Sequence, residues 1–150
     1  MTRDTHIPRL RADVLGEVRP MCINALTALG VPTDGRVWAD TVPEKRKQET
    51  PYITLDGEQD NASRYETLNK YGMGFDLEVR VVSDLLKEAE ELAGEVKRRV
   101  TSIDAPPEPS GLQHLYTEPL AGVPAEALGS GQSDLHETLV RTRLYYRTAN

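Results

Sequence analysis

The chain has 150 residues, of which 18 are basic and 24 acidic, and its formal net charge at pH 7 is −6. This length fits one domain, residues 1–150, with a buried core, and the acidic balance argues against a surface that mainly holds nucleic acid. A single cysteine excludes an internal disulfide, and no run approaches the ~18 apolar residues that span a bilayer, so we expect a soluble intracellular protein.

The first predicted element is a helix from Pro8 to Leu29. Gly30 follows it as a natural C-cap, whereas Pro20 interrupts the pattern and predicts a kinked helix or two short ones. Cys22 lies within the apolar stripe, which favours a small core residue over a nucleophile. The apolar positions at helical spacing are Leu10, Val14, Val18, Met21, Cys22, Ala25 and Leu29.

Two short strands are predicted next, at Arg36–Asp40 and Tyr52–Asp56, and Gly57 marks a bulge or the end of the second. The charged loop between these strands contains the most basic run of the chain, at positions 45–47. That run fits either a solvated loop or a loop that contacts a protein. Residues Glu58–Tyr71 are polar without a clear period, which predicts a long hairpin excursion.

The clearest pattern runs from Gly74 to Ile103 and predicts a long strand followed by an amphipathic helix. Apolar and charged residues alternate over Phe75–Val81, so the charged side chains share one face and the apolar ones the other. Ser83 is a good N-cap for the helix that follows. The apolar stripe of this helix consists of Leu85, Leu86, Ala89, Leu92, Ala93, Val96 and Val100.

The last part of the chain contains two further predicted strands. Leu112–Leu120 carries His114 and Tyr116 on one face, and Ala121–Ser133 is rich in small residues and predicts a mobile loop. The closing strand, His136–Thr148, alternates again. Its charged face carries Glu137, Arg141, Arg143 and Arg147.

The order of these elements, α-β-β-β-α-β-β, predicts an α+β domain. Its sheet is mostly antiparallel with about four to five strands, and two helices pack on one face. The charged faces of the two long strands either form ion pairs across the sheet or meet another subunit.

The search for catalytic chemistry finds none. The three histidines, His6, His114 and His136, are scattered without a second ligand at metal spacing. Phosphate-binding loops and nucleophile elbows are absent from the sequence. We therefore predict no catalytic residues, no metal and no cofactor, and we favour a binding or assembly role over an enzyme.

In this order the elements resemble the tail-completion, or tail-terminator, family of long-tailed bacteriophages. The resemblance extends from Pro8 to Arg147 and is clearest at the strand start Pro51-Tyr52-Ile53 and at the strand-to-helix junction. The other segments that carry it are the helix ending near Gly30, Arg36–Asp40 with Val42-Pro43, Phe75–Val81 and the closing alternating strand.

The resemblance implies a structural protein of the virion tail or neck, assembled in the host cytoplasm. It implies a homo-oligomeric ring, a hexamer, that caps the tail tube, stops its polymerisation and joins it to the head connector or stopper protein. Genome DNA would pass through the lumen without specific binding, and no membrane is involved. The alternatives are another neck or minor tail component (an adaptor or stopper), a small α+β ligand-binding or enzymatic domain, and a regulator that binds one protein.

Within this resemblance, contacts with subunits or partners are expected on the charged strand faces and the adjoining loops. The arginines of the long strands would meet carboxylates of a neighbour, or else pair within one sheet. Loops 43–51 and 58–71 are the candidates for docking to the tube or connector. The candidate contact residues are Lys45, Arg46, Lys47, Asp76, Glu78, Arg80, Glu137, Arg141 and Arg143.

Overall fold

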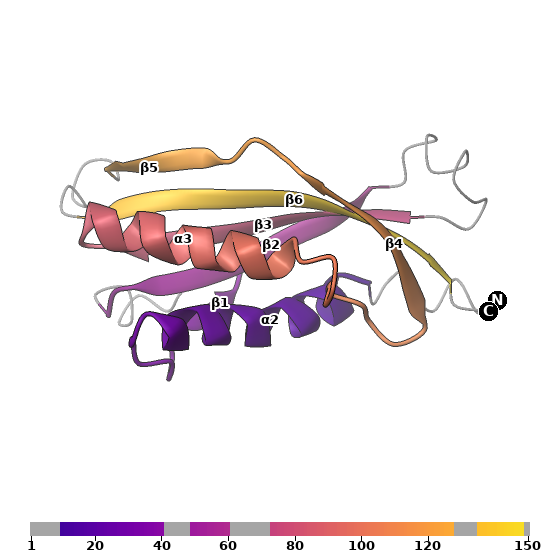
Figure 1. Ribbon diagram of the computed structural model, residues 1–150, viewed down its shortest axis with the longest axis horizontal. Coiled ribbons are helices and arrows are strands. Elements are labelled where there is room, and N and C mark those ends of the chain that lie inside the picture. Colours follow the sequence, from indigo (N-terminus) through magenta and orange to yellow (C-terminus); the bar gives the residue numbers. More distant parts are fainter. Residues whose placement is uncertain (1–9, 41–48, 61–72, 128–134, 149–150) are drawn as a thin grey trace.

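The computed structural model describes residues 10–40, 49–60, 73–127 and 135–148. Two helices lie against a six-stranded sheet (Figure 1). The helices are α2 (Leu10–Ala28) and α3 (Leu86–Val100). The strands are β1 (Val37–Ala39), β2 (Tyr52–Asp60), β3 (Met73–Ser83), β4 (Leu112–Pro119), β5 (Val123–Ala127) and β6 (His136–Thr148).

The strands lie in the order β1-β2-β3-β6-β4, and β5 also pairs with β6. Only the β1–β2 pair is parallel among the described strands, so the predicted α+β class with a mostly antiparallel sheet is confirmed. Strand β5 lies in a stretch predicted to be a mobile loop. That prediction is wrong for Val123–Ala127, because the start of β6 supplies a pairing partner that local composition does not reveal. Residues 128–133 of the predicted loop lie outside the described residues.

The core lies between the helices and the inner face of the sheet. The alternating apolar residues of β3 (Phe75, Leu77, Val79 and Val81) are buried, as predicted. Helix α2 is one helix although Pro20 lies inside it. Proline has no amide hydrogen, so Pro20 leaves the main-chain carbonyl of Gly16 without its helical hydrogen bond. Both residues are exposed, so water can bond to that carbonyl. Among the described residues, no helix is long and apolar enough to cross a membrane.

The core residue Cys22 is fully buried in α2, as predicted. Burial raises the pKa of its thiol to about 12, so the thiolate is scarce at neutral pH. Cys22 is therefore a packing residue with little nucleophilic character.

The start of α3 differs from the prediction. Ser83 is not the N-cap, because the helix begins at Leu86 and its cap residue is Leu85. The Ser83 hydroxyl accepts a bond from the Leu85 amide (3.1 Å) and donates one to Glu88 (2.7 Å), so it holds the turn before the helix. This turn leaves Leu85 61% exposed and Leu86 44% exposed, and the predicted apolar stripe is buried only from Ala89 onward.

Strand β4 places His114 and Tyr116 on opposite faces, not on one face as predicted. The register shifts between these two residues, and the extra residue at position 115 reverses the alternation. The His114 ring packs edge-on against the Tyr146 ring, with the ring centroids 5.8 Å apart. The Tyr116 ring instead packs against the Tyr145 ring, with the ring centroids 5.6 Å apart.

Strand β2 continues without a bulge through Gly57 to Asp60, opposite β3. A Cβ atom at Gly57 would lie 2.5 Å from Cε2 of the Phe75 ring and 2.7 Å from the main-chain oxygen of Asp76. The glycine is therefore required by the close approach of a fully buried ring. Residues 61–72, most of the predicted hairpin excursion, lie outside the described residues.

Substitution Gly57→Ala is expected to destabilise the fold by about 1–3 kcal/mol, because the added methyl displaces the Phe75 ring from a packed core. The matched control is Gly94→Ala on α3, where an added Cβ has no neighbour within 4 Å. The control should stabilise the protein by about 0.5–1 kcal/mol through helix propensity. Urea unfolding measures both, and equal effects at the two sites would contradict the packing argument.

Candidate functional site

The face of the sheet opposite the helices, called the outer face here, carries most of the predicted contact residues. Alternation along β3 and β6 sends their charged side chains to this face, while the intervening apolar residues enter the core. Charged residues on the outer face include Asp56, Glu58, Asp76, Glu78, Arg80, Glu137, Arg141, Arg143 and Arg147.

Strands β3 and β6 are linked by a ladder of opposite charges. Asp76 lies directly opposite Arg143, whose Nε is 2.5 Å from one carboxylate oxygen and whose Nη2 is 3.3 Å from the other. Glu78 lies opposite Arg141 at 3.8 Å. The predicted ion pairs across the sheet are thus confirmed, and each such pair typically stabilises a sheet by ~0.2–1 kcal/mol.

Arg80 extends this ladder along the strand. Its guanidinium lies 3.7 Å from Glu78 on its own strand and 3.3 Å from Glu137, diagonally across on β6. The structure therefore brings together all six predicted strand residues within one chain. Their role as contacts between subunits stays a prediction, and Lys45, Arg46 and Lys47 lie outside the described residues.

Strand β2 contributes two outer-face carboxylates that the sequence analysis did not single out. Asp56 lies opposite Glu78, and Glu58 lies opposite Asp76, so carboxylates face carboxylates across the β2–β3 pair. Like charges in directly opposite positions destabilise a sheet. The alternation of Thr54, Asp56 and Glu58 past Gly57 is the signal that could have extended the predicted strand.

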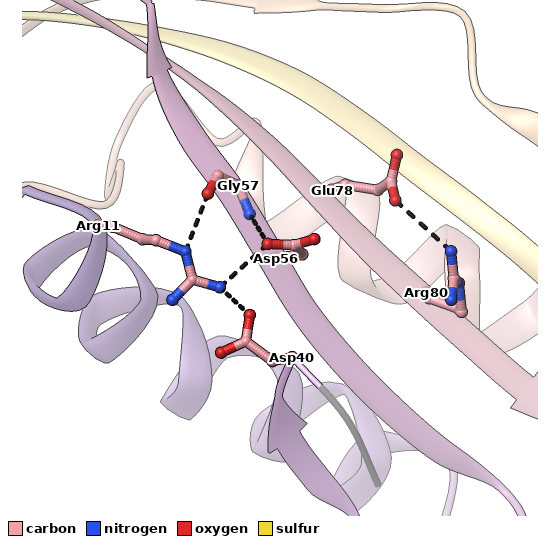
Figure 2. A network of polar contacts seen from close by, with 6 residues as sticks. All are labelled: Arg11, Asp40, Asp56, Gly57, Glu78 and Arg80. Carbon is pink, nitrogen blue, oxygen red and sulfur yellow. Dashed lines mark hydrogen bonds and ion pairs between the residues drawn. The ribbon is translucent and has the colours of Figure 1, made fainter.

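Arg11, at the start of α2, joins this region from a distant part of the sequence. Its Nε donates to the main-chain oxygen of Gly57 (3.0 Å), and its Nη2 contacts the carboxylates of Asp56 (3.0 Å) and Asp40 (Figure 2). The amide of Gly57 donates to Asp56 Oδ1 at 2.7 Å. The hydrogen bond from Arg11 lowers the pKa of the Asp56 carboxyl, partly opposed by desolvation, and the Gly57 amide lowers it further.

An open depression of about 330 Å³ lies on the outer face beside these residues. Charged side chains from β2, β3 and β6 dominate its lining, which suits recognition of charged protein groups better than enclosure of an apolar ligand. Within the described ranges, no group of histidine, cysteine and carboxylate side chains could hold a metal ion. The lining residues are Asp56, Gly57, Glu58, Asp76, Leu77, Glu78, Leu120, Arg141 and Arg143.

No protein-family model matches the chain, and no curated protein matches it. One of the solved structures that match is described as "Virion of native gene transfer agent (GTA) particle". The matched chain is 16% identical in sequence; the match covers 82% of this chain and 84% of that chain, with a TM-score of 0.54. At this identity the similarity shows that the two chains share a fold.

Substitution Arg11→Gln is expected to lower the free energy of unfolding at pH 7 by roughly 1 kcal/mol, because the lost contacts are partly exposed. The loss should shrink as the pH falls below about 4. A carboxyl whose folded-state pKa is depressed stabilises the fold above its unfolded pKa, and this contribution disappears as the pH falls through the folded pKa. Urea unfolding from about pH 7 to about pH 2.5 measures the difference.

The matched control is Arg36→Gln, because Arg36 donates to the main-chain oxygens of Thr50 (2.8 Å) and Pro51 (3.2 Å), which do not titrate. The decrease in the free energy of unfolding caused by Arg36→Gln should stay constant over the same pH range. If the decrease caused by Arg11→Gln were also independent of pH, the ionised Asp56 carboxylate would not stabilise the fold through Arg11.

Proposed function

We propose that this chain is a structural protein of a phage-like particle. The observation that carries the proposal is the fold, which is shared over 82% of the chain with a protein of a gene transfer agent virion. The resemblance of segments such as Thr50–Leu55 and Phe75–Val81 to the tail-terminator family supports the same conclusion. A role in assembly needs complementary surfaces rather than an enclosed pocket, and the open, charged outer face fits that need.

Within such a particle, we infer that the chain is the tail terminator. A hexameric ring of this protein would cap the tail tube at its final length, end the addition of tube subunits and bind the head connector. Contacts between two different surfaces of neighbouring copies close into a ring when the rotation allows it. The net charge of −6 suits a ring through which DNA passes without many phosphate contacts.

The proposed contacts of the ring lie on the outer face and in the basic loop. Arg80, Arg141 and Arg143 already contact carboxylates of their own sheet, so a neighbouring subunit would meet an ordered ladder rather than isolated charges. Ordered side chains lose less conformational entropy when they bind, which favours such a surface as a contact. Lys45, Arg46 and Lys47 stay the proposed docking residues for the tube or connector.

Purified protein is expected to form a ring of about 100 kDa, the mass of six copies of the 16.7 kDa chain, in light scattering and electron microscopy. Added to polymerising tube protein, this ring should shorten the tubes and appear at one end of each. A ring of another symmetry, with no effect on tube length, would favour another neck component such as an adaptor or stopper instead. A monomer at every concentration, with tubes unchanged, would contradict the proposal.

Charge reversal by Arg141→Glu tests the contact between subunits. The substitution places a carboxylate opposite Glu78 and should destabilise the protomer by about 1 kcal/mol, as measured by urea unfolding. If Arg141 also contacts a neighbour, the ring is lost under conditions where the protomer stays folded. The control is Arg98→Glu on α3, whose partner Glu95 lies on the same helix. If the folded Arg141→Glu protein assembles normally, Arg141 makes no contact that the ring needs and acts only within its own sheet.

A further inference from the structure

An open, mostly apolar depression of about 300 Å³ lies beside α3, where this helix packs against β6. Small residues leave the space, since an added Cβ atom at Gly94 would meet no other atom within 4 Å. The link between β4 and β5 forms part of its rim. The lining includes Ala93, Gly94 and Lys97 of α3, Val140 of β6, and Leu120.

Lys97 lies at this depression without a partner. Among the described lysines and arginines, it is the one whose side chain makes no hydrogen bond and no ion pair. Arg98 and Arg99, which follow it, both contact Glu95. An apolar depression with one unpaired ammonium group suits an occupant that carries an aliphatic side chain and a carboxylate together.

The bend after α3 presents such a pair of side chains. Ile103 is 89% exposed, the highest value among the described large hydrophobic residues. Asp104 follows it, is also exposed, and forms no ion pair with any described residue. One exposed apolar residue is common on a protein surface, so the exposure alone marks no site. Here the same bend offers an aliphatic side chain next to an unpaired negative charge, which is the combination that the depression suits.

We infer that Ile103 and Asp104 of one copy bind in the depression of a neighbouring copy. Ile103 would lie against the apolar lining, and Asp104 would pair with Lys97. The two surfaces are different parts of one chain, so the contact can repeat from copy to copy and close into a ring. The inference rests on the proposed function, because it names a contact through which copies of this chain assemble.

Substitution Ile103→Asn should weaken self-association of the full chain about tenfold, because a few buried anchors commonly dominate a protein interface. The stability of the protomer should hardly change, since the side chain is exposed within the single chain. Sedimentation equilibrium measures the first quantity and urea unfolding the second. The matched control is Leu85→Asn at the other end of α3, where an apolar side chain is 61% exposed and self-association should not change.

Exchange of the two charges tests the proposed ion pair. Lys97→Glu and Asp104→Lys should each weaken self-association, because each places like charges opposite one another across the contact. A chain with both changes should recover it, since the pair is restored with its signs reversed. The control is Lys87→Glu on the same helix, because Lys87 contacts Glu91 within its own chain.

Cross-linking reports which residues of two copies meet. Gly94→Cys protein mixed with Ile103→Cys protein should give a product with a short bismaleimide, whereas neither protein alone should cross-link to itself. The native Cys22 is fully buried, so the unchanged chain serves as the blank. A chain with both new cysteines should give a ladder of products that ends at the closed ring.

A product from the mixture, together with recovery on charge exchange, supports the inference. Normal rings from Ile103→Asn without any product from the mixture would overturn it and leave the proposed ring standing. Products that stop at two copies would support the contact and count against the ring, because the pairing would then be reciprocal. If the charge-exchanged chain assembled no better than the single variants, the pairing of Asp104 with Lys97 would be wrong.

Discussion

The alternation of β3 is the constraint on which the rest of the structure depends. This strand is central, with β2 on one side and β6 on the other, and all its 11 residues pair with β6. A shift of one residue would move Phe75 and Leu77 to the outer face and drive Asp76 and Glu78 into the core. Burial of the first pair and hydration of the second therefore determine the register of both neighbouring strands.

The same register explains why the outer face is electrostatically uneven. On the β6 side it places Arg141 and Arg143 opposite carboxylates, and on the β2 side it places Asp56 and Glu58 opposite the same carboxylates. Arg11 relieves part of this excess at the edge of the sheet. Natural sheets commonly protect their edges with charged groups, and Arg11 and Asp56 protect this edge at Gly57.

An assembly protein and an enzyme make different demands on such a fold. An enzyme needs converging polar groups within a cavity that excludes water, whereas an assembly protein needs ordered surfaces that match a neighbour. Here the outer-face side chains are held by bonds within the sheet, and the buried thiol of Cys22 is protected from chemistry by its surroundings. The structure thus presents an ordered, charged outer face and a buried, unreactive thiol.

The sequence by itself determined the elements whose side-chain period is strong: both helices, the alternation of β3 and β6, and the α+β class. It also placed the charged residues of β3 and β6 on one face, because a strand sends alternate side chains to opposite sides. Local pattern could not show β5 or the bulge in β4, since each depends on pairing with β6, a strand distant in sequence. The turn that exposes Leu85 is local, because the Ser83 hydroxyl bonds to the Leu85 amide and to Glu88, and a capping pattern alone did not separate this turn from an N-cap at Ser83. Only the tertiary structure brought Arg11 to Asp56, 45 positions away, and set Glu58 opposite Asp76, because strand register is decided by packing of the whole sheet.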